Sequence, residues 1–273
     1  MDMGLRIRRV EKPWGCESLP PPFAAGACQR IGEIWFEPPP ELTQLLIKYI
    51  FTSEKLSVQV HPNDEQARAA GHDYHGGGGK EECWLVIDAE PGAVLGVGFE
   101  KQLRGEDIRR AALDGSIEQL LTWHPVAKGD FFYIPANTVH AIGAGISLIE
   151  VQQNADVTYR LYDYGRPREL HLDAAVAIAR GGPYDAQLHR RVPDRGTMAL
   201  ADGPYFALHR LDGPPHESLL SAYNGPLLVA PLEGEVGHED SVLRSGECGY
   251  GPTLAAFTFP EGCRSLIARA KSP

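Results

Sequence analysis

The segment LSVQVHPNDEQA, residues 56–67, combines the pattern of a strand with side chains that can bind a metal. Successive side chains of an extended chain point to opposite faces, so three aliphatic residues share one face here. The other face carries Ser57, Gln59 and His61. This alternation predicts a strand that packs on a core with one face. With the other face it presents an amide oxygen and an imidazole to a polar interior.

Two later residues complete a set of metal ligands. Glu82 opens the strand-like run ECWLVI, and His140 closes the segment GDFFYIPANTVH. Two imidazoles, a carboxylate and an amide oxygen suit Zn²⁺ and, less selectively, other divalent first-row metals. Catalytic metal sites keep a position for water or substrate, whereas closed structural zinc sites rely largely on thiolates. We therefore predict an open catalytic site built from Gln59, His61, Glu82 and His140.

The elements that must position these ligands are mostly short strands. Runs with alternating or β-rich composition recur between turn residues: LLIKYIF, ECWLVI, DFFYIP, ISLIEVQ, LLVAPLEGEV and LAAFTF. Helical patterns are fewer and cover residues 63–71, 105–123 and 169–180. Residues 181–204 are rich in Gly, Pro, Arg and Asp and suit a connector. The pattern predicts an all-β-dominated fold, a sandwich or barrel with a few short helices.

Composition limits the partners and the compartment. The 273 residues are 43% hydrophobic, which is enough for a substantial core. With 26 basic against 36 acidic residues, the net charge of −10 argues against nucleic acid or an anionic membrane as a partner. Five scattered cysteines favour a reducing compartment, and neither a signal peptide nor a membrane span is apparent, so we expect a cytoplasmic protein.

A family resemblance joins these observations. Residues 129–140 read Gly, five residues, Pro, one residue, Asn137, two residues, His, which resembles the second metal-binding motif of the cupin superfamily. Asparagine stands where glycine is usual, and it tolerates positive φ better than most residues. With LSVQVHPNDEQA, GKEECWLVI and EVQQNADVTYRLYDYGR in the same order, residues 11–180 resemble the type I mannose-6-phosphate isomerases. The resemblance implies a cupin (jelly-roll) β-barrel with a degenerate second β-barrel unit. It also implies zinc and the interconversion of mannose 6-phosphate and fructose 6-phosphate.

Carried over residue by residue, the resemblance places the zinc ligands on the same four side chains. It implies catalytic roles for Lys80, Glu150 and Arg160, and substrate or phosphate contacts for Lys48, Ser57 and Arg166. Several alternatives stay open. Arg160 and Arg166 could form ordinary surface ion pairs, and Ser57 could simply bond the backbone. The base could be Glu150, Lys80 or His61, although a metal-bound histidine is a poor base.

We expect residues 1–172 to form the metal-binding catalytic domain and residues 173–204 a helix and connector. Residues 205–273 show no second set of ligands, so we expect a metal-free, cupin-like β-rich unit there. The predicted function is a zinc-dependent aldose–ketose isomerase that works through an enediol. Its partner would be a small-molecule sugar phosphate. The alternatives are a cupin isomerase for another sugar phosphate, or a non-catalytic sugar-binding cupin. The sequence does not fix the oligomeric state.

Overall fold

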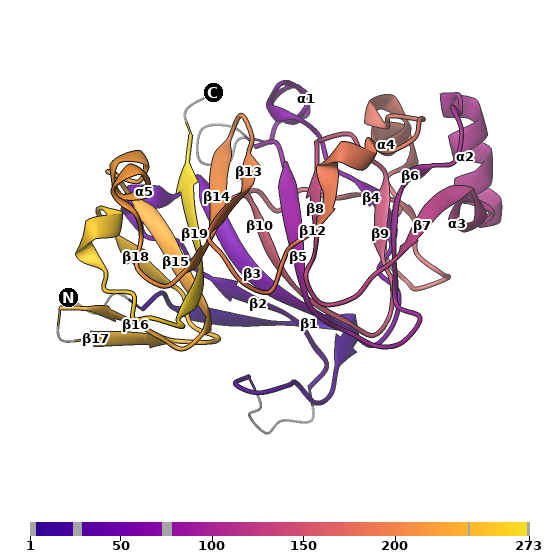
Figure 1. Ribbon diagram of the computed structural model, residues 1–273. Coiled ribbons are helices and arrows are strands. Elements are labelled where there is room, and N and C mark those ends of the chain that lie inside the picture. The colour runs from indigo at the N-terminus through magenta and orange to yellow at the C-terminus, as the bar shows by residue number, and fades with distance from the viewer. Residues whose placement is uncertain (1–3, 24–28, 73–77, 240, 272–273) are drawn as a thin grey trace.

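The computed structural model describes residues 4–23, 29–72, 78–239 and 241–271, and strands dominate it (Figure 1). The first sheet has seven strands in the order β1-β2-β3-β10-β5-β8-β12. All neighbouring strands in it are antiparallel. The bounds are β1 Ile7–Cys16, β2 Ile31–Phe36, β3 Leu45–Thr52, β10 Ile146–Gln153, β5 Glu82–Ala89, β8 Asp130–Ile134 and β12 His189–Arg191.

A second antiparallel sheet of five strands covers the inner face of the first. Its order is β11 (Tyr159–Tyr162), β4 (Val58–Val60), β9 (His140–Ile142), β6 (Val94–Phe99) and β7 (Leu121–Pro125). Trp84 and Leu148 of the first sheet share one apolar cluster with Leu95 and Val97 of the second. The two sheets therefore form a sandwich, and inward-facing side chains of both meet between them.

Strand β5 shows why the central strands of the first sheet are buried on both faces. Trp84 and Val86 belong to the inner cluster, whereas Cys83 and Leu85 belong to an outer cluster shared with the C-terminal strands. Because side chains alternate, Glu82 shares the inner face with Trp84. A polar residue on such a strand consequently enters the interior of the sandwich.

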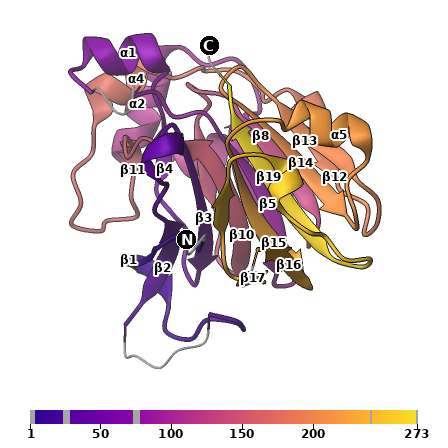
Figure 2. The same cartoon turned by 90° about the vertical axis from the view of Figure 1, so that its left-hand side faces the viewer.

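The C-terminal strands form a third layer on the outer face of the first sheet. Their sheet has the order β13 (Met198–Asp202), β14 (Phe206–Asp212), β19 (Arg264–Ala270), β15 (Leu227–Glu233) and β18 (Gly249–Gly251). A hairpin of β16 (Glu235–His238) and β17 (Ser241–Arg244) lies beside it. Phe206 and Leu266 pack in one cluster with Ile47 and Phe131 of the first sheet. Figure 2 shows this third layer along the side of the first sheet.

In the described part of the chain, five short α-helices flank the sheets: α1 Asp64–Ala69, α2 Gly105–Asp114, α3 Ile117–Leu120, α4 Leu172–Ile178 and α5 Glu217–Ala222. Apolar residues of α2, α3 and α4 pack with Val58, Val60 and Leu161 on the outer face of the second sheet. In Figure 1 these three helices lie at the opposite end of the molecule from the C-terminal sheet. Among the described residues, no helix combines the length and apolar character that crossing a membrane requires.

The strand-dominated class agrees with the prediction, but some element boundaries differ. The helical pattern predicted over residues 105–123 ends at Leu120, and Trp123 lies in strand β7. Gly115, at φ +82°, ends α2 in a left-handed conformation that glycine adopts without strain. The segment 181–204 contains β12, which pairs with β8, and β13, which pairs with β14. Helix α5 was not predicted.

Candidate metal centre and substrate cavity

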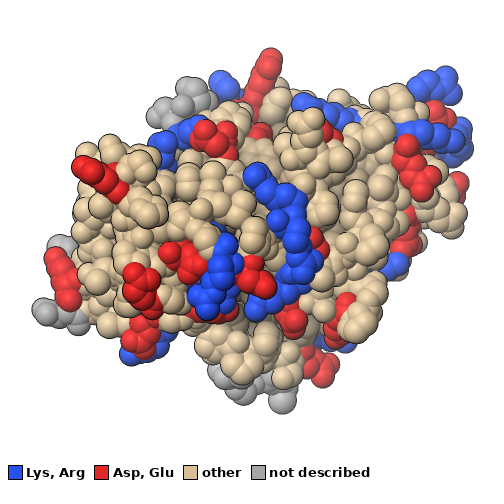
Figure 3. All heavy atoms as spheres, viewed as in Figure 1, with Lys and Arg blue, Asp and Glu red and all other residues tan. Residues whose placement is uncertain are grey.

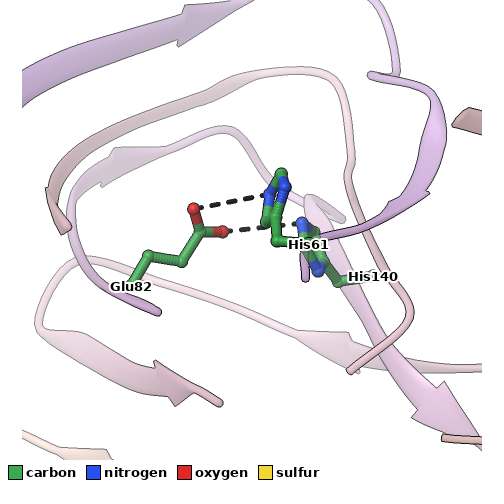
Figure 4. Close-up of side chains that lie close together, drawn as sticks. All are labelled: His61, Glu82 and His140. Atoms are coloured by element: carbon green, nitrogen blue, oxygen red, sulfur yellow. Dashed lines mark ion pairs between the residues drawn. The ribbon is translucent and has the colours of Figure 1, made fainter. Parts of the chain in front are cut away.

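Three buried side chains converge between the first and second sheets. His61, Glu82 and His140 each offer one ligand atom, and these atoms lie within 4.8 Å of one another (Figure 4). Glu82 Oε2 is 3.6 Å from His61 Nε2, and Glu82 Oε1 is 3.5 Å from His140 Nε2. All three side chains are at most 2% exposed. Three of the four predicted ligands therefore form one compact cluster.

The histidine rings are oriented by the backbone. His61 Nδ1 lies 2.7 Å from the Val157 carbonyl oxygen, and His140 Nδ1 lies 2.9 Å from the Thr138 carbonyl oxygen. A carbonyl only accepts, so each Nδ1 carries the proton and donates it. Each Nε2 is then left with a lone pair that faces Glu82. Such an outer hydrogen bond is what fixes the tautomer of a metal-binding histidine.

Local backbone structure sets the positions of the two histidines. Gln59 pairs directly with His140 across β4 and β9. Asn137 adopts φ +70° in the turn that precedes β9, as its place in the motif predicted. Its backbone N–H donates to the His61 carbonyl at 2.8 Å, and its side chain bonds Gln66 of the capping box of α1. The turn thus ties the segment of one ligand to the segment of the other.

The fourth predicted ligand lies beside this cluster. Gln59 Nε2 is 3.2 Å from His140 Nε2, and Ser57 Oγ donates to Gln59 Oε1 at 3.1 Å. A half-turn of the amide would exchange its nitrogen and oxygen, so the group can present an acceptor to the cluster. Ser57 is 2% exposed and also contributes to the cavity wall, and its hydroxyl donates to the Gln59 side chain.

The donor set fits a divalent metal. Glu82 Oε1 is buried and makes no hydrogen bond in the described part of the chain. Buried acceptors are nearly always paired, so this oxygen suits an ion as its partner. Lys80 Nζ contacts Glu82 Oε2 and lies 3.1 Å from His61 Nε2. The lone pairs of these two atoms therefore already face a positive charge. Neutral imidazoles and an ionised carboxylate are the metal-binding forms of these side chains.

The protonation states agree with that requirement. Burial, helped by the nearby Lys80 ammonium, lowers the pKa of His61 well below its usual value, and burial also lowers the pKa of His140. For Glu82, burial acts to raise the pKa, but Lys80 and His140 outweigh it and the pKa falls below its usual value. At neutral pH the cluster is therefore two neutral imidazoles facing one carboxylate.

A cavity of 430 Å³ opens above the cluster. Gln59, Lys80 and Glu150 line it, whereas His61, Glu82 and His140 lie behind its wall. Five cationic side chains line it, namely Lys12, Lys48, Lys80, Arg160 and Arg168, against three acidic ones, namely Glu33, Glu150 and Asp156. Elsewhere basic and acidic groups are interspersed, as Figure 3 shows for one face. In a chain of net charge −10, this local excess of cations suits an anionic ligand.

Glu150 lies deep in the cavity between two lysines. Its Oε1 is 2.8 Å from Lys48 Nζ and 3.5 Å from Lys80 Nζ, and its Oε2 accepts a 2.9 Å hydrogen bond from Trp84. The Oε1 contacts are ion pairs without hydrogen-bond geometry. Burial acts to lower the pKa of Lys48, but the charges of Glu150 and Glu33 outweigh it and raise that pKa. Strand register explains the contact, because Glu150 on β10 faces Lys48 on β3 and Trp84 on β5.

The arginines divide into two groups. Arg160 lines the cavity, its Nε is buried without a hydrogen bond, and no ion pair involves it among the described residues. Arg168 also lines the cavity and holds Asp163 through two bonds of 2.6 Å. Arg166 does not line it: this guanidinium bonds Glu54 and the Lys55 carbonyl at 2.9 Å each. The structure thus brings Arg160 to the site and leaves Arg166 outside it.

Sequence reasoning missed four charged side chains of the cavity: Lys12, Glu33, Asp156 and Arg168. For Glu33 a signal existed, because it shares a face with Trp35 in the strand-like run IGEIWF. A carboxylate on the face of a buried strand points to an interior partner in the same way as Glu82 does. Arg168 gave no such signal, since its spacing does not distinguish it from Arg166.

The chain is similar in sequence to named mannose-6-phosphate isomerases, although no family model matches it. It is 36% identical to the mannose-6-phosphate isomerase of Streptococcus mutans over 239 residues, 82% of this chain and 73% of that protein. It is 38% identical to the mannose-6-phosphate isomerase ManA of Bacillus subtilis over 202 residues, 70% of this chain and 62% of that protein.

Solved structures extend the match to nearly the whole chain. The crystal structure of the Bacillus subtilis mannose 6-phosphate isomerase superimposes with a TM-score of 0.78 at 26% identity, covering 98% of this chain and 99% of that one. A zinc-bound mannose 6-phosphate isomerase superimposes with a TM-score of 0.73 at 14% identity, covering 99% of each chain. These matches confirm the predicted cupin fold class.

Proposed function

Because the chain belongs to the mannose-6-phosphate isomerase family, we propose that it interconverts mannose 6-phosphate and fructose 6-phosphate with the help of zinc. One observation carries the proposal. The buried cluster of His61, Glu82 and His140 lies under a cavity of 430 Å³ that Lys80, Glu150 and Arg160 line. A metal site, a group able to move protons and an unpaired cation are what an isomerase for a phosphorylated sugar requires.

Gln59, His61, Glu82 and His140 would hold the metal, with Ser57 orienting the Gln59 amide. Bound zinc would supply Lewis acidity that stabilises negative charge developing on the sugar oxygens. The protein would contribute the rest. Both imidazoles are fixed by their Nδ1 bonds to backbone carbonyls, so no reorientation is needed when substrate binds.

Either Glu150 or Lys80 would transfer the proton, because both line the cavity next to the cluster of His61, Glu82 and His140. In the aldose-to-ketose direction the base removes the proton from C2, and the C1–C2 bond becomes the double bond of an enediol. The same protein group, after its proton can exchange with water, delivers a proton to C1, the hydroxyl proton passes from O2 to O1, and C2 becomes the carbonyl. Glu150 is the better candidate for the base, because the Lys80 ammonium is already engaged with Glu82 of the cluster. Lys80 would then stabilise the negative charge of the enediol.

Arg160 would bind the phosphate, since its buried Nε has no partner in the described chain. Arg168 lies in the same cavity wall, and it is the second guanidinium that this structure offers to an anion. The expected role of Arg166 has less support, because its guanidinium does not line the cavity and is engaged by Glu54 and Asp163. Lys48 would act through Glu150 rather than on substrate, because it pairs with that carboxylate at 2.8 Å.

We also propose a reducing, cytoplasmic location. The described cysteines, Cys16, Cys83, Cys248 and Cys263, form no disulfide, and three of them are buried. Free buried thiols are typical of reducing compartments, where disulfides are not maintained.

Metal analysis and a coupled assay test the proposal together. We expect one zinc per chain by plasma mass spectrometry and turnover of mannose 6-phosphate but not of unphosphorylated mannose. In D₂O, NMR of the two sugar phosphates should show deuterium bonded to carbon, because a protein group exchanges its proton with water. Turnover without carbon-bound deuterium would exclude the enediol route. Absence of any turnover by the zinc-loaded protein would refute the proposed reaction.

A further inference from the structure

A row of buried charges runs from the rim of the cavity to the metal ligands. Lys12 Nζ lies 3.3 Å from Glu33 Oε1, Lys48 Nζ lies 2.8 Å from Glu150 Oε1, and Lys80 connects Glu150 to Glu82. Signs alternate along the whole row. The order of neighbouring strands explains this arrangement, because β1, β2, β3, β10 and β5 are consecutive in the first sheet. Each of these strands contributes at least one inward-facing polar side chain to the row.

Glu33 and its partner Lys12 are the members of this row that the proposed reaction does not use, and Glu33 is the buried one of the two. It is 6% exposed, and its Oε2 accepts a 2.6 Å hydrogen bond from Trp35 Nε1. Burial acts to raise the pKa of Glu33, but Lys48 and Lys12 outweigh it and lower that pKa, so the group is a carboxylate at neutral pH. A buried ion pair stabilises a fold little compared with an apolar replacement. Stability is therefore a weak reason for a carboxylate at this position.

Geometry links Glu33 to Glu150 through Lys48. Trp35, which holds Glu33, faces Lys48 across β2 and β3, and Lys48 faces Glu150 across β3 and β10. Lys48 forms an ion pair with Glu150, whereas Glu33 influences it at longer range, and the charges of both carboxylates raise its pKa. The negative charge of Glu33 also repels a negative charge on Glu150, so it offsets part of the stabilisation that Lys48 gives the Glu150 carboxylate.

We propose that Glu33 is a positioning residue of the isomerisation: by offsetting part of the charge of Lys48 next to Glu150, it leaves that carboxylate able to take up the C2 proton. The inference rests on the proposed function. The charged and titratable groups around Glu150 are Lys48 from β3, Lys80 from the preceding loop, Glu82 and Cys83 from β5, Glu33 from β2, and the two cluster histidines. Cys83 stays a thiol, because burial raises its pKa well above its usual value. Of these groups, Glu33 is the carboxylate outside the metal cluster.

Two substitutions should move the reaction in opposite directions. Glu33→Gln keeps an oxygen for the Trp35 hydrogen bond and removes the charge, so Lys48 acts on Glu150 alone and favours its carboxylate form. The acid limb of kcat against pH should then shift down by about 0.5–1 pH unit, and the plateau kcat should fall about 3- to 10-fold. Lys12→Met removes the cation that partly neutralises Glu33, so the same limb should shift up. The Lys12 side chain is 27% exposed, which makes this variant a mild change to the fold.

Controls separate this role from a structural one. Glu33→Asp retains the charge and should return the limb toward that of the wild type. Glu37→Gln, just beyond β2, removes a glutamate charge that is 41% exposed and paired with Arg6, and it should leave the profile unchanged. Zinc content and KM for mannose 6-phosphate should stay within about twofold of wild type in all four variants.

A second measurement does not depend on turnover. In zinc-loaded protein carrying ¹³C-carboxyl glutamate, Glu150→Gln identifies the Glu150 resonance, and its titration midpoint can be followed by NMR. We expect the midpoint to move down in Glu33→Gln and up in Lys12→Met. Superimposable midpoints and kcat profiles in wild type and Glu33→Gln would overturn the inference, as would a fall in kcat that merely follows zinc loss. Shifted midpoints in a protein that fails to convert mannose 6-phosphate would instead refute the proposed function.

Discussion

Replacing Lys48 by methionine should destabilise the protein because it leaves a buried carboxylate without its nearest cation. The side chains of Lys48 and Glu150 are 7% and 3% exposed, and their charged atoms lie 2.8 Å apart. Breaking a buried pair by removing one partner costs about 3–5 kcal/mol. Glu150 keeps Lys80 at 3.5 Å and the Trp84 hydrogen bond at 2.9 Å, so we expect the lower end, about 3 kcal/mol.

Such a loss corresponds to a fall in Tm of about 6–12 °C for a protein of this size. Denaturant unfolding followed by circular dichroism measures it as a change in the free energy of unfolding. The double variant Lys48→Met/Glu150→Gln removes both charges and should recover most of the stability, since no uncompensated charge remains buried. A single variant within about 1 kcal/mol of wild type, or a double variant no more stable than the single, would refute the reasoning.

The contribution of Lys48 to the free energy of unfolding depends on pH in a direction that its pKa shift determines. Glu150 and Glu33 raise the folded-state pKa of Lys48 above its usual value of about 10.4. A raised lysine pKa contributes stability that is fully present below the unfolded-state value and is lost only as pH rises toward the folded-state value. The Lys48 contribution should therefore be constant between pH 6 and pH 9, roughly, and decline only in more alkaline solution.

Five further substitutions test the site. His61→Ala and His140→Ala should each abolish stoichiometric zinc and activity, because the remaining ligands cannot hold the ion tightly; plasma mass spectrometry that finds full zinc in both contradicts the ligand assignment. Arg168→Met should lower kcat/KM for mannose 6-phosphate about tenfold or more while Arg166→Met changes it little, and equal losses would remove the distinction between them. Asn137→Val should cost about 1–3 kcal/mol in unfolding free energy, since a β-branched residue is strained at φ +70°, and an unchanged denaturation midpoint would count against this.

The convergence of His61, Glu82 and His140 was predictable because its signals are local. Alternation assigned Gln59 and His61 to one face, and Glu82 opened a run that is apolar on both sides. The motif that ends at His140 indicated a turn, and Asn137 does adopt a positive φ there. Each of these inferences needs only the geometry of a few consecutive residues. The resemblance of four separated motifs then placed them in one family.

The helical segment 105–123 shows where local signals fail. Its pattern continues beyond Leu120, but the residues that follow pair with β6 and become strand β7. Residues 121–125 form a strand because pairing with β6, some 25 residues earlier in the chain, outweighs their helical propensity. The arginines show the same limit, because the contacts of Arg166 with Glu54 and Lys55 join segments more than 100 residues apart.

The sequence by itself determined which face of each strand is polar, which residue types can bind a metal, and where the chain must turn. Only the tertiary structure decided which strands are neighbours, and therefore that Lys48, Glu150 and Trp84 lie side by side on β3, β10 and β5. It also decided that Glu33 completes their row of charges and that Arg168 rather than Arg166 lines the cavity. The physical reason is that a side chain's face depends on its own backbone. Its neighbour across a sheet depends on hydrogen bonds and apolar packing between segments far apart in the sequence.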